Sequence, residues 1–175
     1  PDRAVEVYTQ ILKRLYPHVP VVVGGIEASL RRLAHYDYWS DALRPSILAT
    51  SGADLLMYGM GEKVVGEVVR AFSNGYNAKL LRRLRQVAFL ADRAYVERLD
   101  PADTIRLNSY ERCTEDKRAF GANFVEEETL SNLLEPRATL VEPTGDRYVV
   151  VTPPNAVPTT EELDRAFDLP YERAP

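Results

Sequence analysis

The sequence predicts an α/β fold: a partial, doubly wound parallel sheet of Rossmann or flavodoxin type, with an appended helical and β-hairpin segment. The apolar runs 20–23 and 53–58 are short and continuous, which is typical of strands buried on both faces. A glycine turn and a stretch with helical spacing follow each run, as in βαβ units. Later in the chain, two strand-like runs flank the turn signal 142–146 and predict a hairpin.

The first half supplies the elements of the parallel sheet. Apolar residues recur at helical spacing from Ala4 to Leu15, and Pro17 ends that helix. The remaining elements, in chain order, are a strand at 20–23, a helix at 26–34, a strand at 53–58, a helix at 64–72 and a third strand at 86–90. The crossovers between parallel strands should be right-handed.

The second half has a different pattern. Apolar residues between 110 and 134 share one helical face, but Gly121 and the run 126–128 interrupt it, so we expect two helices. The hairpin strands are predicted at 137–141 and 147–151, and a capping box of Thr159 and Glu162 predicts a last short helix. We therefore divide the chain into an α/β region, 1–100, and a helical and hairpin extension, 101–175.

Composition narrows the classes of function. The chain has 175 residues, 45% of them hydrophobic and 27% charged, which predicts a protein with a buried core. A net charge of −4 argues against sequence-independent nucleic-acid binding, and no apolar run is long enough for a membrane span. The single cysteine, Cys113, cannot provide a disulfide framework or a cysteine-based metal site within this chain. Because the sequence opens on Pro1 with no signal peptide, we expect a piece of a larger cytoplasmic protein.

Two glycine turns are candidate parts of a ligand site. Gly24, Gly25, Glu27 and Ser29 lie where the first strand meets its helix, and Gly59 and Gly61 follow the second strand. Ligands of open α/β sheets bind at the carboxyl ends of the strands, and helix N-termini there favour anions. The alternative interpretation is a tight turn that needs small residues for packing. Glu27 also opposes phosphate binding, because its carboxylate occupies the positive end of the helix dipole.

The segment 35–41 is the densest cluster of polar and aromatic residues in the chain. Its candidate binding residues are His35, Asp37, Trp39 and Asp41, and the arginines at 31, 32 and 44 flank it. A histidine and aspartates could perform acid–base chemistry or form one pair of metal ligands. No second histidine or cysteine lies nearby to complete a metal site, so an amphipathic lid or interface is the alternative. We name no catalytic residue and no metal ligand.

Several long segments resemble one known family. The strings VVVGGIEASLRR (21–32), HYDYWSD (35–41) and ADLLMYG (53–59) look like the signature of the YgiQ family of radical SAM proteins. The segments 116–120, 145–151 and 169–171 also resemble it, so the similarity runs nearly end to end. In that family this region precedes the radical SAM barrel, and its glycine pattern is similar to cobalamin-binding-type domains.

The resemblance implies a parent protein that binds a [4Fe–4S] cluster and S-adenosylmethionine. The Cys-x3-Cys-x2-Cys triad that would hold the cluster is absent here, so this chain itself is expected to hold no cofactor. The Asp-x-His-x-x-Gly cobalamin motif is also missing, which puts cobalamin in doubt. The implied partners are the radical SAM barrel of the same chain and an unidentified small-molecule or macromolecular substrate.

Three functions are compatible with these residues. The first is an auxiliary domain that shapes or covers the substrate site of a radical SAM enzyme without doing radical chemistry. The second is a module that binds cobalamin, a nucleotide or a substrate in the crevice between Gly24-Gly25 and Gly59-Gly61. The third is a plain interdomain scaffold. We also expect segment 36–41 to lie at the surface that meets the barrel or its substrate, because a core would not hold two unpaired carboxylates.

Overall fold

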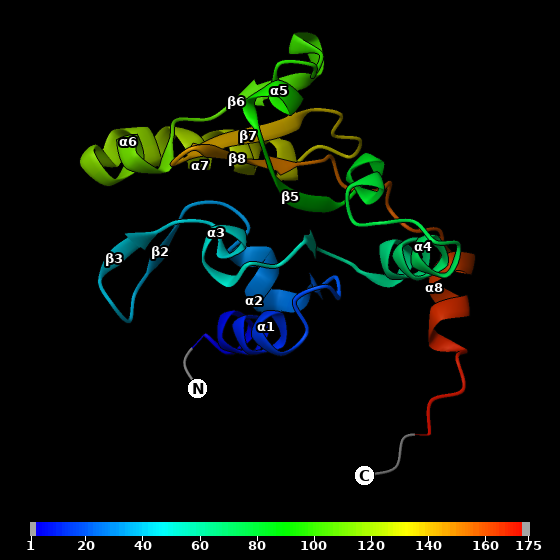
Figure 1. The fold of residues 1–175 in the computed structure, drawn as a ribbon. Coiled ribbons are helices and arrows are strands. Elements are labelled where there is room, and N and C mark those ends of the chain that lie inside the picture. The colour runs from blue at the N-terminus through cyan, green and yellow to red at the C-terminus, as the bar shows by residue number, and fades with distance from the viewer. Residues whose placement is uncertain (1–2, 173–175) are drawn as a thin grey trace.

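The computed structural model describes residues 3–172 and shows a six-stranded mixed sheet with a separate two-stranded hairpin (Figure 1). The order across the sheet is β1-β4-β5-β8-β7-β6, so strands from both halves of the chain belong to one sheet. Its strands are β1 (Val22–Val23), β4 (Leu55–Met57), β5 (Val87–Ala91), β6 (Thr104–Arg106), β7 (Thr139–Thr144) and β8 (Arg147–Val151). The hairpin consists of β2 (His35–Asp37) and β3 (Ala42–Arg44).

Eight α-helices and two short 3-10 helices connect these strands within the described residues. The α-helices are α1 (Ala4–Leu15), α2 (Gly25–Leu30), α3 (Ile47–Ser51), α4 (Glu62–Ser73), α5 (Arg93–Val96), α6 (Tyr110–Glu115), α7 (Lys117–Ser131) and α8 (Thr160–Phe167). The 3-10 helices are η1 (Leu80–Arg83) and η2 (Pro101–Asp103). Two helices are present in this part of the chain, but the break is not at Gly121 or at 126–128, which both lie inside α7. It lies at Asp116, whose side chain accepts from the backbone N–H of Arg118 and so caps α7.

The expectation of a parallel sheet holds for only part of the structure. β1 and β4 are parallel, as are β6 and β7, but β5 runs antiparallel to β4 and β8 runs antiparallel to β5. The reason lies between α4 and β5, where η1 returns the chain to the carboxyl end of β4. There the Gln86 side chain donates to the carbonyl of Tyr58 at 2.8 Å and also to that of Met60. β5 therefore starts where β4 ends, and runs in the opposite direction.

The hairpin of β7 and β8 is confirmed, but it begins later than predicted and its turn is shorter. β7 extends to Thr144, so only Gly145 and Asp146 form the turn, with Gly145 at φ 59°. Gly145 supplies the left-handed conformation that such a tight turn needs. Glu142 consequently lies inside a strand rather than in a loop.

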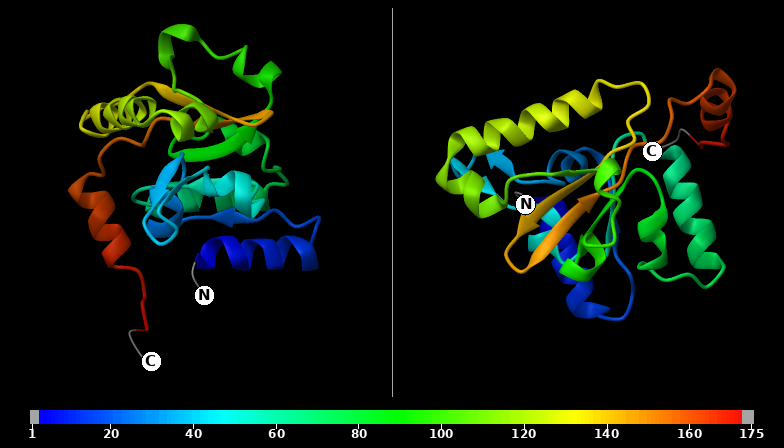
Figure 2. Two further views of the ribbon diagram at one scale, coloured as in Figure 1. Left: turned by 90° about the vertical axis from the view of Figure 1, so that its left-hand side faces the viewer. Right: turned by 90° about the horizontal axis from the view of Figure 1, so that it is seen from above.

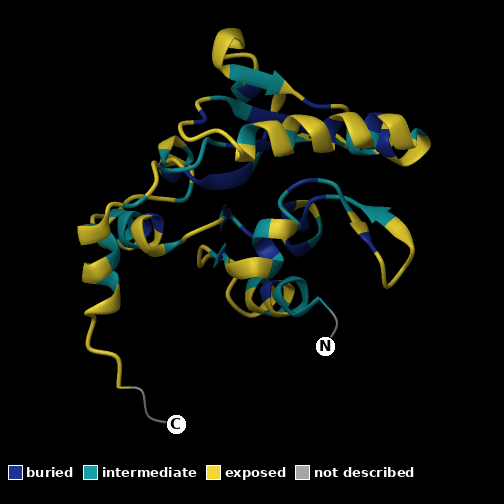
Figure 3. Ribbon diagram, turned by 180° about the vertical axis from the view of Figure 1, so that it is seen from behind, coloured by how far each residue is buried: buried dark blue, intermediate teal, exposed yellow. Residues whose placement is uncertain are grey.

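Helices cover both faces of the sheet, and the strands alternate between two cores (Figure 3). One core holds Leu56, Ala88 and Val149 against α2 and α3, and partly buried residues of α1 and α7 pack on it. The other core holds Leu55, Phe89 and Val150 against α4, η1 and α5. Neighbouring residues of a strand thus face opposite layers, as the period of two requires. This two-sided burial explains the continuous apolar runs in the sequence.

The last helix stands apart from this layered body (Figure 2). The predicted capping box of α8 is present: the Thr159 hydroxyl accepts from Glu162 N, and Glu162 accepts from Thr159 N. No residue of α8 is buried. Within the described residues, its side-chain hydrogen bonds are all local.

Candidate functional site

The first glycine turn is a close approach between β1, α2 and β4. Gly24 is extended, and Gly25 has a φ of 83°, in the left-handed region that favours glycine. A Cβ on Gly24 would lie 3.4 Å from the carbonyl oxygen of Met57. Neither glycine lines the two cavities described below. The geometry thus accounts for this turn by backbone packing.

The second turn is joined to α2 directly. The backbone N–H of Gly59 donates to the hydroxyl of Ser29 at 3.1 Å, so the structure brings these two predicted residues together. They line a cavity of about 300 Å³ between α2, α7 and the ends of β4 and β8. Ser29 and Gly59 thus border this cavity, and the Gly24-Gly25 pair does not.

Arg32 provides the positive charge at this small cavity. Its guanidinium pairs with the Glu127 carboxylate, lies 5.0 Å from the centre of the Tyr58 ring, and donates to the carbonyl of Ser29 at 2.6 Å. Its buried Nε has no hydrogen-bond partner. The remaining walls are mostly apolar or backbone, from segments 130–140 and 151–154. The cavity suits a small ligand with an apolar body and one polar group.

A larger groove of about 1120 Å³ adjoins the small cavity and shares Tyr58 and Gly59 with it. Gly61 lines this groove at the start of α4, where no side chain caps the helix. The opposite wall is formed by segment 154–158 and α8.

Glu27 bonds to groups of its own chain. Its carboxylate accepts from the backbone N–H of Val5 at 3.2 Å and from the Arg31 guanidinium at 3.1 Å. It thereby ties the first turn of α1 to α2. A side chain held in this way supports the structure, and its negative charge opposes an anionic ligand.

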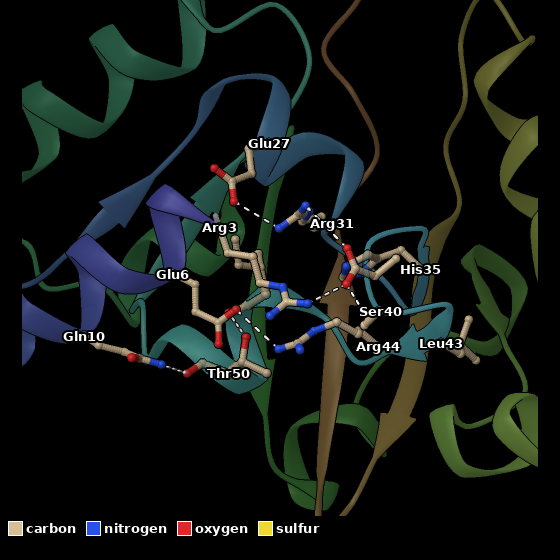
Figure 4. A network of polar contacts seen from close by, with 12 residues as sticks. Arg3, Glu6, Gln10, Glu27, Arg31, His35, Ser40, Leu43, Arg44 and Thr50 are labelled. Atoms are coloured by element: carbon tan, nitrogen blue, oxygen red, sulfur yellow. Dashed lines mark hydrogen bonds and ion pairs between the residues drawn. The ribbon is translucent and has the colours of Figure 1, made fainter. Parts of the chain in front are cut away.

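Asp37 forms the centre of a polar network at the turn end of the β2–β3 hairpin, where it pairs with Ala42. Figure 4 shows Arg3, Arg31 and Ser40 of this network. The Arg3 guanidinium lies 2.5 Å from its carboxylate, Arg31 lies 3.9 Å away, and the Ser40 hydroxyl donates at 2.6 Å. Only 2% of Asp37 is exposed. The Ser40 and Arg3 hydrogen bonds lower its pKa to about 2, so the carboxylate is ionised at neutral pH. The segment 36–41 is thus divided: one carboxylate is buried with fixed partners, while the tip lies outside the core.

That tip presents aromatic rings. Trp39 is 68% exposed and stacks on Tyr38, with ring centres 4.7 Å apart. Asp41 has a φ of 47° in the turn and accepts a hydrogen bond from the Tyr36 hydroxyl at 2.6 Å. Because Asp41 is engaged with Tyr36, the exposed surface is mainly aromatic.

His35 lies at the start of β2, partly buried. Its Nδ1 lies 3.1 Å from the carbonyl of Leu33, and burial is the main cause that lowers its pKa. Its ring therefore favours the neutral form at neutral pH. His35 lines neither cavity.

Glu142 is the residue that sequence reasoning missed. It is 1% exposed on β7, and both carboxylate oxygens accept from the backbone N–H of Ala34, at 2.9 and 3.1 Å. Burial raises its pKa to about 8, so the side chain is mostly protonated at neutral pH. The available signal was a glutamate just after an apolar strand run, which we took for the start of a turn.

Cys113 is poorly suited to bind a metal ion as a thiolate. The Asn123 side chain donates to its sulfur at 3.2 Å, and burial raises its pKa to about 11. Residues 3–172 contain no group of three or more histidine, cysteine, aspartate or glutamate side chains placed to hold a metal ion. Within the same residues, no helix has the length and apolar character needed to cross a bilayer.

Comparison with known proteins identifies the family. The model of the "Radical SAM N-terminal" family matches residues 1–175. A "UPF0313 protein" of Porphyromonas gingivalis is 48% identical over 176 residues, which cover 100% of this chain and 27% of the relative. UPF0313 proteins of Thermotoga maritima and Methanocella arvoryzae are 41% and 40% identical, and the matches cover 29% and 28% of those relatives.

The chain spans less than a third of the length of these relatives. No solved structure matches it. The match over the whole chain confirms the resemblance found in the sequence, and the chain belongs to the Radical SAM N-terminal family.

Proposed function

We propose that this chain is the N-terminal auxiliary domain of a radical SAM enzyme and that it shapes or covers the substrate site of the catalytic part. The family implies a [4Fe–4S] cluster and S-adenosylmethionine in the parent. The residues of this chain do not fit the cluster, because its one thiol is buried and engaged with Asn123. The domain would therefore contribute surface and shape rather than reactive groups.

The observation that supports this role is the exposed aromatic tip of the β2–β3 hairpin. Tyr38 and Trp39 are 67% and 68% exposed, yet the buried Asp37 directly before them is fixed by Arg3 and Ser40. Tyrosine and tryptophan are enriched in interfaces and often dominate their binding energy. We infer that this tip contacts the catalytic part or the substrate held there.

The test separates stability from activity. Trp39→Ala should cost the 175-residue chain about 1 kcal/mol in urea denaturation, as for an average substitution. In the reconstituted full-length enzyme, the same change should reduce turnover far more. Tyr16→Ala is the control, since Tyr16 is 57% exposed at the far end of α1. A loss of roughly 3–5 kcal/mol would place Trp39 in the core, and unchanged turnover would contradict the role of the tip.

The small cavity supports a second candidate, a small-ligand module at the carboxyl ends of β4 and β8. The parallel β1–β4 pair, with helices on both faces of the sheet, supports a partial likeness to cobalamin-binding domains. A volume of about 300 Å³ suits a ligand much smaller than cobalamin, and no histidine lines either cavity. A histidine-ligated cobalamin therefore does not fit these residues. Calorimetric titration with nucleotides, with Arg32→Lys as the variant, tests the candidate; no heat of binding would exclude these ligands.

A further inference from the structure

The groove between α4 and α8 is formed by segments that are far apart in the sequence. Its walls come from the segment after β4, from α4, from segment 154–158 and from α8 with the residues after it. Figure 1 shows α4 and α8 beside each other, away from the β2–β3 hairpin. The groove is thus separate from the aromatic tip.

Large apolar side chains that line this groove are exposed. Met60, Val65, Val157, Leu169 and Tyr171 are exposed by 54, 43, 69, 55 and 57%, respectively. Charged residues also border the groove: Glu62, Lys63, Arg70, Glu162 and Arg165. A cluster of exposed apolar side chains among charged ones is the usual composition of a protein-binding surface.

Helix α8 has little to hold it in place in the described structure. It has no buried residue, and Phe167 on the same helix is 74% exposed. Its bonds are local: the capping box at Thr159, and a hydrogen bond from the Tyr171 hydroxyl to the carbonyl of Ala166 at 3.0 Å. An isolated helix of eight residues is marginal in water, so its stability depends on packing of its apolar side. We therefore expect another part of the protein to pack against the apolar side of α8, in the groove.

We propose that this groove binds the part of the same polypeptide that follows residue 175, namely the catalytic part of the radical SAM enzyme. This inference rests on the proposed function. The matched relatives are more than three times as long as this chain, which leaves a large part of the protein available as a partner. Tyr171, one residue before the end of the described chain, lines the groove, so the described chain ends beside it. A segment tethered there has an effective concentration of about millimolar, which favours it over a second copy.

The test measures thiol accessibility in the full-length protein. Val65→Cys places a thiol in the groove, and Val125→Cys places one on α7 at a position that lines neither cavity. In the structure these valines are 43% and 62% exposed, so both substitutions should be tolerated. If the groove is filled, the thiol at position 65 should react with a maleimide at least about tenfold more slowly than the thiol at 125. The reason is that the thiol at 65 reacts only when the structure around it opens locally. Labelling is read by peptide mass spectrometry, so cysteines elsewhere do not interfere.

Two further measurements make the result specific. In urea the two thiols should react at the same rate, which shows that the difference comes from folding. Equal rates in the folded full-length protein would overturn the proposal, and so would protection that disappears on dilution, since the occupant would then be a second copy. The proposed role of the hairpin fails independently, through unchanged turnover of Trp39→Ala.

Discussion

The buried carboxyl group of Glu142 predicts an unusual dependence of stability on pH. Its pKa is raised to about 8 from an ordinary value of 4.5, mainly by burial. The folded protein therefore holds this proton more tightly than the unfolded chain does. The contribution of the bound proton to the unfolding free energy has its full value below pH 4.5 and is lost as the pH rises towards 8.

The magnitude follows from the displacement of the pKa. Each unit is worth about 1.4 kcal/mol, so the 175-residue chain should lose roughly 1.5–2 kcal/mol of unfolding free energy between about pH 6.5 and 8. Glu142→Gln keeps an oxygen that can accept from Ala34 N but cannot ionise, so this loss should disappear. The slope against pH is the readout, because the new amide N–H group has its own cost of burial.

Urea denaturation followed by circular dichroism at four pH values in this window measures that slope. The window begins near the ordinary pKa of histidine, about 6.5, so that the lowered pKa of His35 contributes little. Glu126→Gln is the matched control, since Glu126 is exposed on α7 and should keep the slope of the parent chain. An unchanged slope in Glu142→Gln would refute the reasoning.

Two further predictions concern the other site residues. Asp37→Asn should lower the melting temperature at neutral pH, because it removes the carboxylate that bonds Arg3 and Ser40. The parent chain should lose the stability that this carboxylate contributes as the pH falls from about 4 to 2, and the variant should show less of this loss. An unchanged acid profile would contradict this. Anaerobic reconstitution of the 175-residue chain with iron and sulfide should give no stoichiometric cluster, since the chain has one thiol and a cluster needs several, and a stable charge-transfer absorbance on the monomer would contradict this.

The sequence was sufficient for the local elements and insufficient for their pairing. The apolar runs at β1 and β4, the β7–β8 hairpin and the capping box at Thr159 follow from patterns within a few residues. The direction of β5 depends on Gln86, which binds carbonyls nearly thirty residues earlier in the chain. Such long-range contacts leave no periodic signal in the sequence.

The same limit applies to the candidate site. The glycine turns were placed at the correct edge of the sheet, because strand–turn–helix geometry is local. The partners of Asp37 could not be inferred, since Arg3 lies 34 residues away in the sequence. Burial of Glu142 could not be inferred either, because its donor, Ala34 N, is a backbone group 108 residues away.

These two buried carboxyl groups together fix the segment that leads into the hairpin. Glu142, on β7, accepts from the backbone of Ala34, and Asp37 is bonded by Arg3 and Ser40. The segment is thus held from the sheet on one side and from α1 on the other, while Trp39 at the tip remains exposed. A binding surface that is already ordered loses less conformational entropy when its partner binds. The buried carboxyl groups at 37 and 142 therefore support the same interpretation as the exposed rings, a preorganised aromatic surface whose orientation is set by residues that do not themselves touch the partner.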